Sequence, residues 1–184
     1  MSKGQAIELP ESLVAVRVGF RWLATPRRGL FGSRVREIDL DASAVLFADR
    51  QPVDVVFFSH LVSDDGSLRH TGDSLVGGVG QDGDDEAILV DLQRVPAHID
   101  QIVFSVNSFV GQTFQEVRST LCRLVDEASG QELARFTMVG GAACNARIMA
   151  KVHRAGVGWR MTALGASASG RTFQDLVPAM LPQL

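Results

Sequence analysis

Hydrophobic and polar residues alternate through much of the chain, in the pattern typical of half-buried β-strands. Residues 12–22 show it clearly, with Phe20, Trp22 and three valines on one parity and Arg17 and Arg21 on the other. Because successive side chains of a strand point to opposite faces, this segment is predicted to bury one face. Segments of similar character are residues 38–47, 53–59, 86–92, 101–109, 117–126, 132–138, 146–154 and 157–164.

Turns and two helix starts separate these segments. Residues 64–67 and 128–131 have the Asp, Ser and Gly content of hairpin turns. Thr113 and Thr172 each precede an acidic residue by three positions, which is a helix-capping pattern; the first predicts a single turn and the second a helix to Met180. Many short strands and few helices predict a mainly β fold, a two-sheet antiparallel β-sandwich.

No long linker or internal repeat divides the chain, so one domain over residues 1–184 is expected, with residues 25–34 as its most mobile loop. No apolar run approaches the roughly 20 residues of a membrane-spanning helix, and the start lacks an apolar signal core. Cys122 and Cys144 are too few and too far apart for a disulfide framework. A cytoplasmic protein without membrane insertion is therefore expected.

The net charge of −3 conceals a segregated distribution. Residues 37–100 carry 14 carboxylates against three arginines, while the rest of the chain carries an excess of Arg and Lys. Such a local excess of acid requires either much water or a bound cation. The arginines of residues 17–36 are a conceivable nucleic-acid site, but the chain is acidic overall and no aromatic stacking motif accompanies them. No DNA or RNA partner is expected.

Five carboxylates and five glycines occur together in residues 71–86, TGDSLVGGVGQDGDDE. Glycines allow the backbone to fold back and direct carbonyl and carboxylate oxygens inward. Calcium takes six to eight oxygen ligands in irregular geometry, so this loop is predicted to bind a hard cation. A solvated acidic turn is the alternative. Asp39 and Asp41 share one face of an extended segment and are predicted to add oxygens, with room for two neighbouring ions.

These residues resemble the TerD family of tellurium-resistance and bacterial stress proteins. The resemblance covers most of the chain, from about residue 14 to 165. It rests on the following segments, which occur in the family's order: DLDAS at 39–43, HTGD at 70–73, GDDE at 83–86, VPA at 95–97 and GQELARF at 130–136.

Several features follow from this resemblance. It implies a two-sheet β-sandwich with acidic calcium-binding loops at one end and no established catalytic activity. Carried over residue by residue, the implied Ca²⁺ ligands are Asp39, Asp41, Asp73, Asp82, Asp84, Asp85 and Glu86, with the carbonyl of Gly80. The expected function is a non-enzymatic, calcium-binding stress-response module in which one or two ions order the loops, and these present a surface to an unidentified protein partner.

Other chemistries fit the sequence less well. Residues 78–83 form a literal GxGxxG, but three carboxylates and a strand follow it, with no helix to receive a pyrophosphate. The four histidines lack common zinc-site spacings, although His70 adjoins the acidic loop and could donate a hydrogen bond to a ligand. Two alternatives remain: a metal-dependent phosphoryl or hydrolytic enzyme, and, by resemblance to slime-mould relatives, a cyclic-nucleotide-binding protein that would use Arg21 or Arg69.

Overall fold

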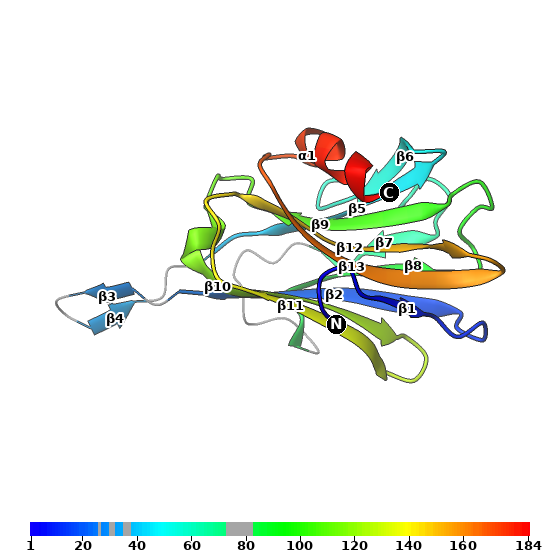
Figure 1. The fold of residues 1–184 in the computed structure, drawn as a ribbon, viewed down its shortest axis with the longest axis horizontal. Coiled ribbons are helices and arrows are strands. Elements are labelled where there is room, and N and C mark those ends of the chain that lie inside the picture. The colour runs from blue at the N-terminus through cyan, green and yellow to red at the C-terminus, as the bar shows by residue number, and fades with distance from the viewer. Residues whose placement is uncertain (26, 30–31, 35–37, 73–82) are drawn as a thin grey trace.

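Two antiparallel β-sheets pack face to face in the computed structural model of the protein (Figure 1). The structure describes residues 1–25, 27–29, 32–34, 38–72 and 83–184. The first sheet has six strands, in the order β1 (Ala6–Glu8), β13 (Gly158–Ala168), β12 (Ala146–Ala155), β9 (Gln101–Asn107), β5 (Asp41–Ala48) and β6 (Gln51–Val56). The predicted antiparallel β-sandwich is thus confirmed.

The second sheet has five strands, and its centre is the alternating segment at the start of the chain. Its order is β11 (Glu132–Val139), β10 (Val117–Asp126), β2 (Ala15–Ala24), β8 (Glu86–Asp91) and β7 (Leu68–His70). A separate short pair, β3 (Arg27–Gly29) and β4 (Gly32–Arg34), projects from the sandwich (Figure 1). Within the loop predicted over residues 25–34, these six residues pair as strands, which the sequence did not indicate.

The core fills the space between the sheets. Val16, Val18, Phe20 and Trp22 of β2 are at most 1% exposed, as their parity predicts. Phe20 meets Phe104 of the opposite sheet with ring centroids 6.4 Å apart. Burial of large apolar side chains from both layers is the main contribution to holding the sheets together.

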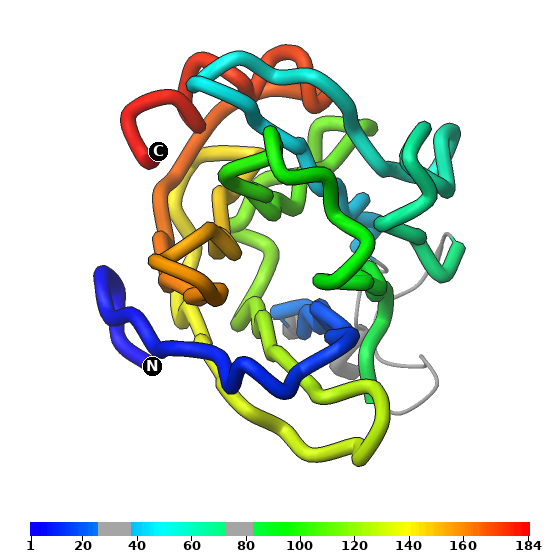
Figure 2. The backbone as a smooth tube through the Cα atoms, turned by 90° about the vertical axis from the view of Figure 1, so that its right-hand side faces the viewer, coloured from blue at the N-terminus to red at the C-terminus, as the bar shows by residue number. Residues whose placement is uncertain are grey.

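A second, smaller core lies on the outer face of the six-stranded sheet, beneath helix α1 (Phe173–Met180). Leu176 and Met180 of α1 are fully buried against Val45 and Phe47, which point away from the main core because they have the opposite parity to Ala44 and Leu46. Figure 2 shows this C-terminal segment, in red, on the outside of the layer that contains the cyan strands.

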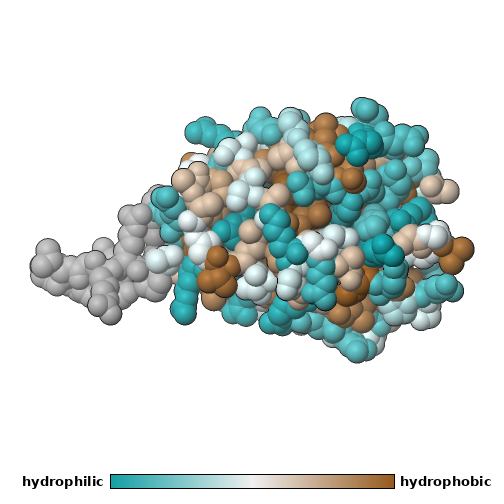
Figure 3. Space-filling view, in the orientation of Figure 1, coloured by the Kyte–Doolittle hydropathy of each residue, from teal (hydrophilic) through white to brown (hydrophobic). Residues whose placement is uncertain are grey.

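The predicted helix starts are both present. α1 begins after Thr172, where Asp175 Oδ2 accepts the backbone N–H groups of Arg171 and Thr172. After Thr113 there is one 3₁₀ turn, Phe114–Glu116, as predicted, and a further 3₁₀ turn, Leu181–Gln183, follows α1. Among the described residues, no helix is long and apolar enough to span a membrane. Hydrophilic residues cover most of the face in Figure 3, with smaller hydrophobic patches between them.

Candidate functional site

The acidic residues at the start of β8 diverge onto the two faces of the five-stranded sheet. β8 pairs with β2 from Glu86 opposite Phe20, and the Asp85 N–H donates to the Phe20 carbonyl at 2.7 Å. Asp84 lies before this pairing begins, on the outer face, whereas Glu86 shares the inner face with Phe20. Consecutive carboxylates of the sequence therefore have separate surroundings.

Asp84 is held by arginine on the outer face of the sheet. Arg123 of β10 donates to both carboxylate oxygens, from Nε at 2.6 Å and from a terminal nitrogen at 2.9 Å, and a terminal nitrogen of Arg17 lies 3.6 Å away. The Asp84 carboxylate lies directly over Gly19, where a Cβ would overlap it. The hydrogen bonds from Arg123 to Asp84 raise the pKa of the guanidinium further above its usual value. Asp84 is thus the acceptor of a nearly buried, bidentate ion pair.

Asp85 and Glu86 join elements at the end of the sandwich. Asp85 Oδ2 accepts the backbone N–H of Trp22 at 2.8 Å, and Glu86 Oε2 accepts that of Ala42 at 2.7 Å. The second bond links β8 to β5 of the opposite sheet. A buried carboxylate needs hydrogen bonds or opposite charge. The two bonds satisfy this need and hold Trp22 of β2 and Ala42 of β5 against the start of β8.

His70 lies beside Glu86 with its ring fully buried. Its Nδ1 accepts the Gly72 N–H at 3.1 Å, so the neutral ring carries its hydrogen on Nε2. Nε2 in turn lies 3.3 Å from Glu86 Oε2. Nε2 is therefore in contact with Glu86 but does not meet the geometry of a hydrogen bond, and the bond that the sequence suggested for this histidine is not made within the described residues.

Asp41, the first residue of β5 in the six-stranded sheet, lies at the same end of the sandwich as Asp85 and Glu86. It precedes Ala42, whose N–H binds Glu86, and its Oδ2 accepts the Phe109 N–H at 3.3 Å. Asp39 is half-buried, and its N–H donates to Gln112 Oε1. Asp41, Asp85 and Glu86 are 9%, 7% and 2% exposed. The predicted ligands Asp73, Gly80 and Asp82 lie outside the described residues.

The donor set fits a hard cation in chemistry but is incomplete within the described part of the chain. Carboxylate oxygens are the ligands that Ca²⁺ prefers. At this end, however, the described side chains do not place three ligand atoms within 4.8 Å of one another. A six- to eight-oxygen site here therefore needs further oxygens, which the sequence offers in residues 73–82.

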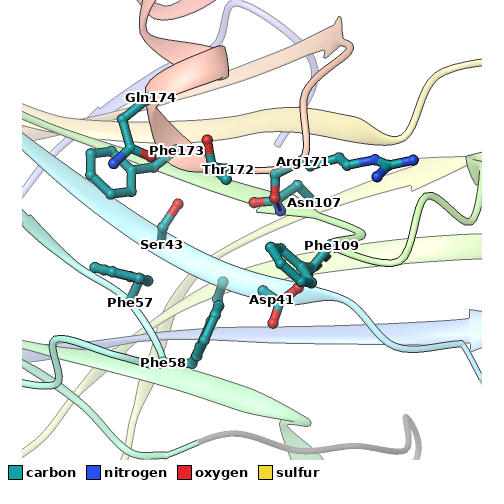
Figure 4. Close-up of a pocket in the computed structure, with 11 residues that line it drawn as sticks. Asp41, Ser43, Phe57, Phe58, Asn107, Phe109, Arg171, Thr172, Phe173 and Gln174 are labelled. Carbon is teal, nitrogen blue, oxygen red and sulfur yellow. Dashed lines mark hydrogen bonds between the residues drawn. The ribbon is translucent and has the colours of Figure 1, made fainter.

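An aromatic cavity of about 180 Å³ adjoins Asp41 (Figure 4). Four phenylalanines enclose it, and the polar side chains of Ser43 and Asn107 lie at its β5 and β9 side. Asn107 Nδ2 donates to the Arg171 carbonyl and so ties the segment before α1 to β9. The phenylalanines are Phe57, Phe58, Phe109 and Phe173.

The four rings form a continuous wall. The Phe57 ring contacts Phe58 and Phe173 at centroid distances of 5.3 and 5.2 Å, and Phe58 contacts Phe109 at 6.3 Å. Phe58 and Phe109 are 38% and 52% exposed. Tilted and edge-to-face contacts of this kind are the favourable arrangement of aromatic rings. The acidic end of the sandwich thus carries a partly exposed apolar surface next to its carboxylates.

Sequence reasoning did not find this cavity or the arginine partner of Asp84. The parity of Arg123, between the buried residues Cys122 and Leu124, places it on the outer face, but only the fold brings it to Asp84. The alternation of residues 53–55 gives way to an unbroken apolar run over residues 55–58, a signal that the predicted strand over residues 53–59 ends early; β6 ends at Val56. Phe109 and Phe173 are brought there by distant elements.

Comparison with known proteins places these features in a family. The family model described as the TerD domain matches residues 1–179. The chain is 36% identical over 181 residues to the tellurium resistance protein TerZ of Serratia marcescens, covering 95% of this chain and 92% of the relative. It is 30% identical over 193 residues to the stress response protein SCP2 of Bacillus subtilis (strain 168), covering 96% of each.

Solved structures share the fold. A homologue of telluride resistance protein (TerD) from Streptomyces coelicolor A3(2) superposes with a TM-score of 0.66 at 20% sequence identity, over 90% of this chain and 96% of the other. At this identity the likeness supports the sandwich architecture alone.

Proposed function

The chain belongs to the TerD family of tellurium-resistance and stress proteins, and on that premise we propose that it is a non-enzymatic, calcium-binding stress-response module. Its proposed location is the cytoplasm, in line with the free thiols of Cys122 and Cys144. Bound calcium would supply a divalent charge that holds acidic segments of both sheets together.

The observation that carries the proposal is the gathering of Asp41, Asp85 and Glu86, all nearly buried, at one end of the sandwich. Burying several carboxylates close together is costly unless opposite charge offsets their repulsion. A calcium ion offers two positive charges and accepts oxygens from loops and strands alike. In the proposed site, Asp39, Asp41 and Asp85 contribute oxygens together with the segment 73–82, which follows the His70 strand.

Asp84 and Glu86 have partly structural roles in this proposal. Both oxygens of Asp84 accept hydrogen bonds from Arg123, so Asp84 anchors the start of β8 to the outer face of the sheet. Glu86 Oε2 holds β5 through the Ala42 N–H. Anchoring of β8 by both residues positions Asp85 between them.

The aromatic cavity is the proposed interaction surface. Its wall includes the exposed rings of Phe58 and Phe109, and Asp41 both lines the cavity and accepts the Phe109 N–H. An ion that fixes Asp41 would therefore fix the position of Phe109 as well. A protein partner with an apolar side chain of suitable size would meet a surface whose shape depends on calcium.

The proposal is tested by the effect of calcium on thermal unfolding. A ligand bound only by the native state stabilises it by about 2.7 kcal/mol at a hundredfold excess over Kd. For a domain of this size, 1 kcal/mol corresponds to about 2–4 °C in Tm. We expect calorimetry to show a Tm increase on adding Ca²⁺ to chelator-treated protein. Asp41→Asn and Asp85→Asn should lose most of that increase.

The matched control is Asp126→Asn, at the last residue of β10, at the far end of β2 from Trp22 and Asp85. It loses local hydrogen bonds but should keep the full increase in Tm with calcium. An equal increase in all three variants would refute the site. Turnover of phosphate esters with Ca²⁺, Mg²⁺ or Mn²⁺ that disappears in Asp41→Asn would refute the non-enzymatic role.

A further inference from the structure

A second polar cluster lies on β6 and on the connection from β6 to β7, away from the proposed calcium ligands. It consists of Asp54, His60 and Asp64. Among the residues that the structure describes, these three each place one ligand atom within 4.8 Å of the other two. The cluster combines one imidazole with two carboxylates, which is a different donor set from the oxygen-only acidic end.

The hydrogen bond of the His60 ring directs one of its nitrogens for metal binding. Its Nδ1 lies 2.8 Å from the Val55 carbonyl oxygen. Because a carbonyl can only accept, Nδ1 carries the hydrogen, and a neutral ring then has its lone pair on Nε2. Metal-binding histidines commonly donate the other ring N–H to a backbone carbonyl in this way, which fixes the tautomer and the direction of the coordinating nitrogen.

The spacing of the donors also suits a shared ion. His60 Nε2 lies 3.7 Å from Asp64 Oδ1, which is too long for a hydrogen bond. Two ligands bound tetrahedrally at about 2.1 Å from one ion are about 3.4 Å apart, so a small movement of Asp64 would bring them to that spacing. Asp54 Oδ1 lies 3.8 Å from Nδ1, the nitrogen that carries the hydrogen, so Asp54 has to turn toward Nε2 to share the ion.

The backbone around the cluster is held in place. Asp54 accepts the Val55 N–H at Oδ1 and the Asp64 N–H at Oδ2, at 2.7 and 2.8 Å. Phe57 and His60 exchange two backbone hydrogen bonds across the intervening turn. Asp54 therefore connects the two ends of the segment that carries His60, while the side chain of Asp64 is 90% exposed and open to an ion from solvent.

We propose that Asp54, His60 and Asp64 bind a divalent transition-metal ion of the Zn²⁺ type, with water completing its coordination. An imidazole nitrogen favours such ions over Ca²⁺, and two carboxylates balance the double positive charge. Phe57 and Phe58 lie within the same connection, so the ion would brace one side of the aromatic cavity. This site does not depend on the proposed calcium function.

The test is calorimetric titration of the full chain with ZnCl₂ in the presence of excess CaCl₂, which occupies oxygen-only sites. We expect one Zn²⁺ per chain in the unsubstituted protein and at least tenfold weaker binding in His60→Asn and in Asp64→Asn. His98→Asn, which replaces an exposed histidine outside the cluster, is the matched control and should bind within twofold of the unsubstituted protein.

Co²⁺ gives a second readout, because visible absorption reports a nitrogen- and oxygen-coordinated ion. The bands should appear with the unsubstituted protein and His98→Asn, and be absent with His60→Asn. Failure of the unsubstituted protein to bind Zn²⁺, or equal binding by the His60 and His98 variants, would overturn the site. The Tm increase with calcium should persist in His60→Asn, so failure of either metal site is distinguishable from failure of the other.

Discussion

Gly19, which has no Cβ, allows the Asp84 carboxylate to lie among the arginines on the outer face of the five-stranded sheet. Gly19 lies between Arg17 and Arg21 on the outer parity of β2 and pairs with Arg123 of β10. The absence of a Cβ there leaves room for the Asp84 carboxylate to lie on the strand and reach the Arg123 guanidinium. From Arg123 the charges continue to Glu132 and Arg135.

Gly19→Ala tests this arrangement. The added Cβ would overlap the Asp84 carboxylate, and moving that carboxylate would separate a nearly buried ion pair. We expect a loss of about 2–4 kcal/mol in unfolding free energy, measured by urea denaturation. Gly158→Ala is the control, because its nearest neighbour atom would lie 4.0 Å from the new Cβ, and it should change stability by less than about 0.5 kcal/mol. Equal effects of the two substitutions would refute the steric role of Gly19.

At the residue scale, the sequence located the acidic groups better than it located their contacts. It predicted the run from Asp84 to Glu86 as a set of ligands, and the structure directs Asp84 to Arg123 and Glu86 to Ala42. Alternation assigns side chains to the two faces of a sheet only within a strand. β8 begins at Glu86, so alternation says nothing about the direction of the Asp84 side chain. The direction taken by Asp84 therefore depends on distant residues, Gly19 and Arg123.

At the scale of elements, alternation predicted the long strands well and the short ones not at all. β10 has the predicted bounds, and β2 and β12 differ from prediction by three residues or fewer at each end. β1 and β7, with three residues each, are too short for alternation to be recognised and depend on pairing with β13 and β8. β13 was predicted to end at Leu164 but continues through Gly165, whose φ of 58° a non-glycine residue rarely adopts.

The pair of strands β12 and β13 makes a prediction about pH. His153 is half-buried between them, with Nε2 3.1 Å from Thr162 Oγ1. Burial lowers the pKa of His153, and the charges of Lys151 and Arg160 lower it further. The unfolded state then binds the proton more readily, so stability should fall as the pH drops through the ordinary histidine pKa of about 6.5 toward the lower native value.

Urea denaturation between pH 7.5 and 5 measures this contribution against His153→Gln. The substituted protein should lose less stability on acidification, because the other titrating groups are common to both chains. An identical pH dependence in the two proteins would show that His153 does not contribute.

At the scale of the whole molecule, the sandwich has two unlike ends. At the acidic end Glu86 joins the sheets through the Ala42 N–H, and Asp85 holds Trp22. At the other end of β2, the β10–β11 turn is stabilised by hydrogen bonds within itself, such as that from the Gly130 N–H to the Asp126 carbonyl. The sequence predicted the acidic character of one end through the segregation of charge. The adjoining aromatic cavity, by contrast, brings together β5, β9, α1 and the connection after β6, which no local pattern links.

This difference between the ends predicts where calcium should slow backbone hydrogen exchange. If the ion holds the acidic end closed, Trp22 and Ala42, whose amides donate to Asp85 and Glu86, should exchange up to about 100-fold more slowly at a hundredfold excess of Ca²⁺ over Kd. The Gly130 amide lies in an exposed turn at the other end, where we expect exchange through local opening, so it should keep its rate and serves as the internal reference. Measurement of individual amides by NMR with calcium and with chelator separates the two ends. Unchanged rates at Trp22 and Ala42, or equal slowing at Gly130, would contradict a calcium ion acting at the acidic end, because only an ion that contacts the acidic segments would stabilise their hydrogen bonds selectively.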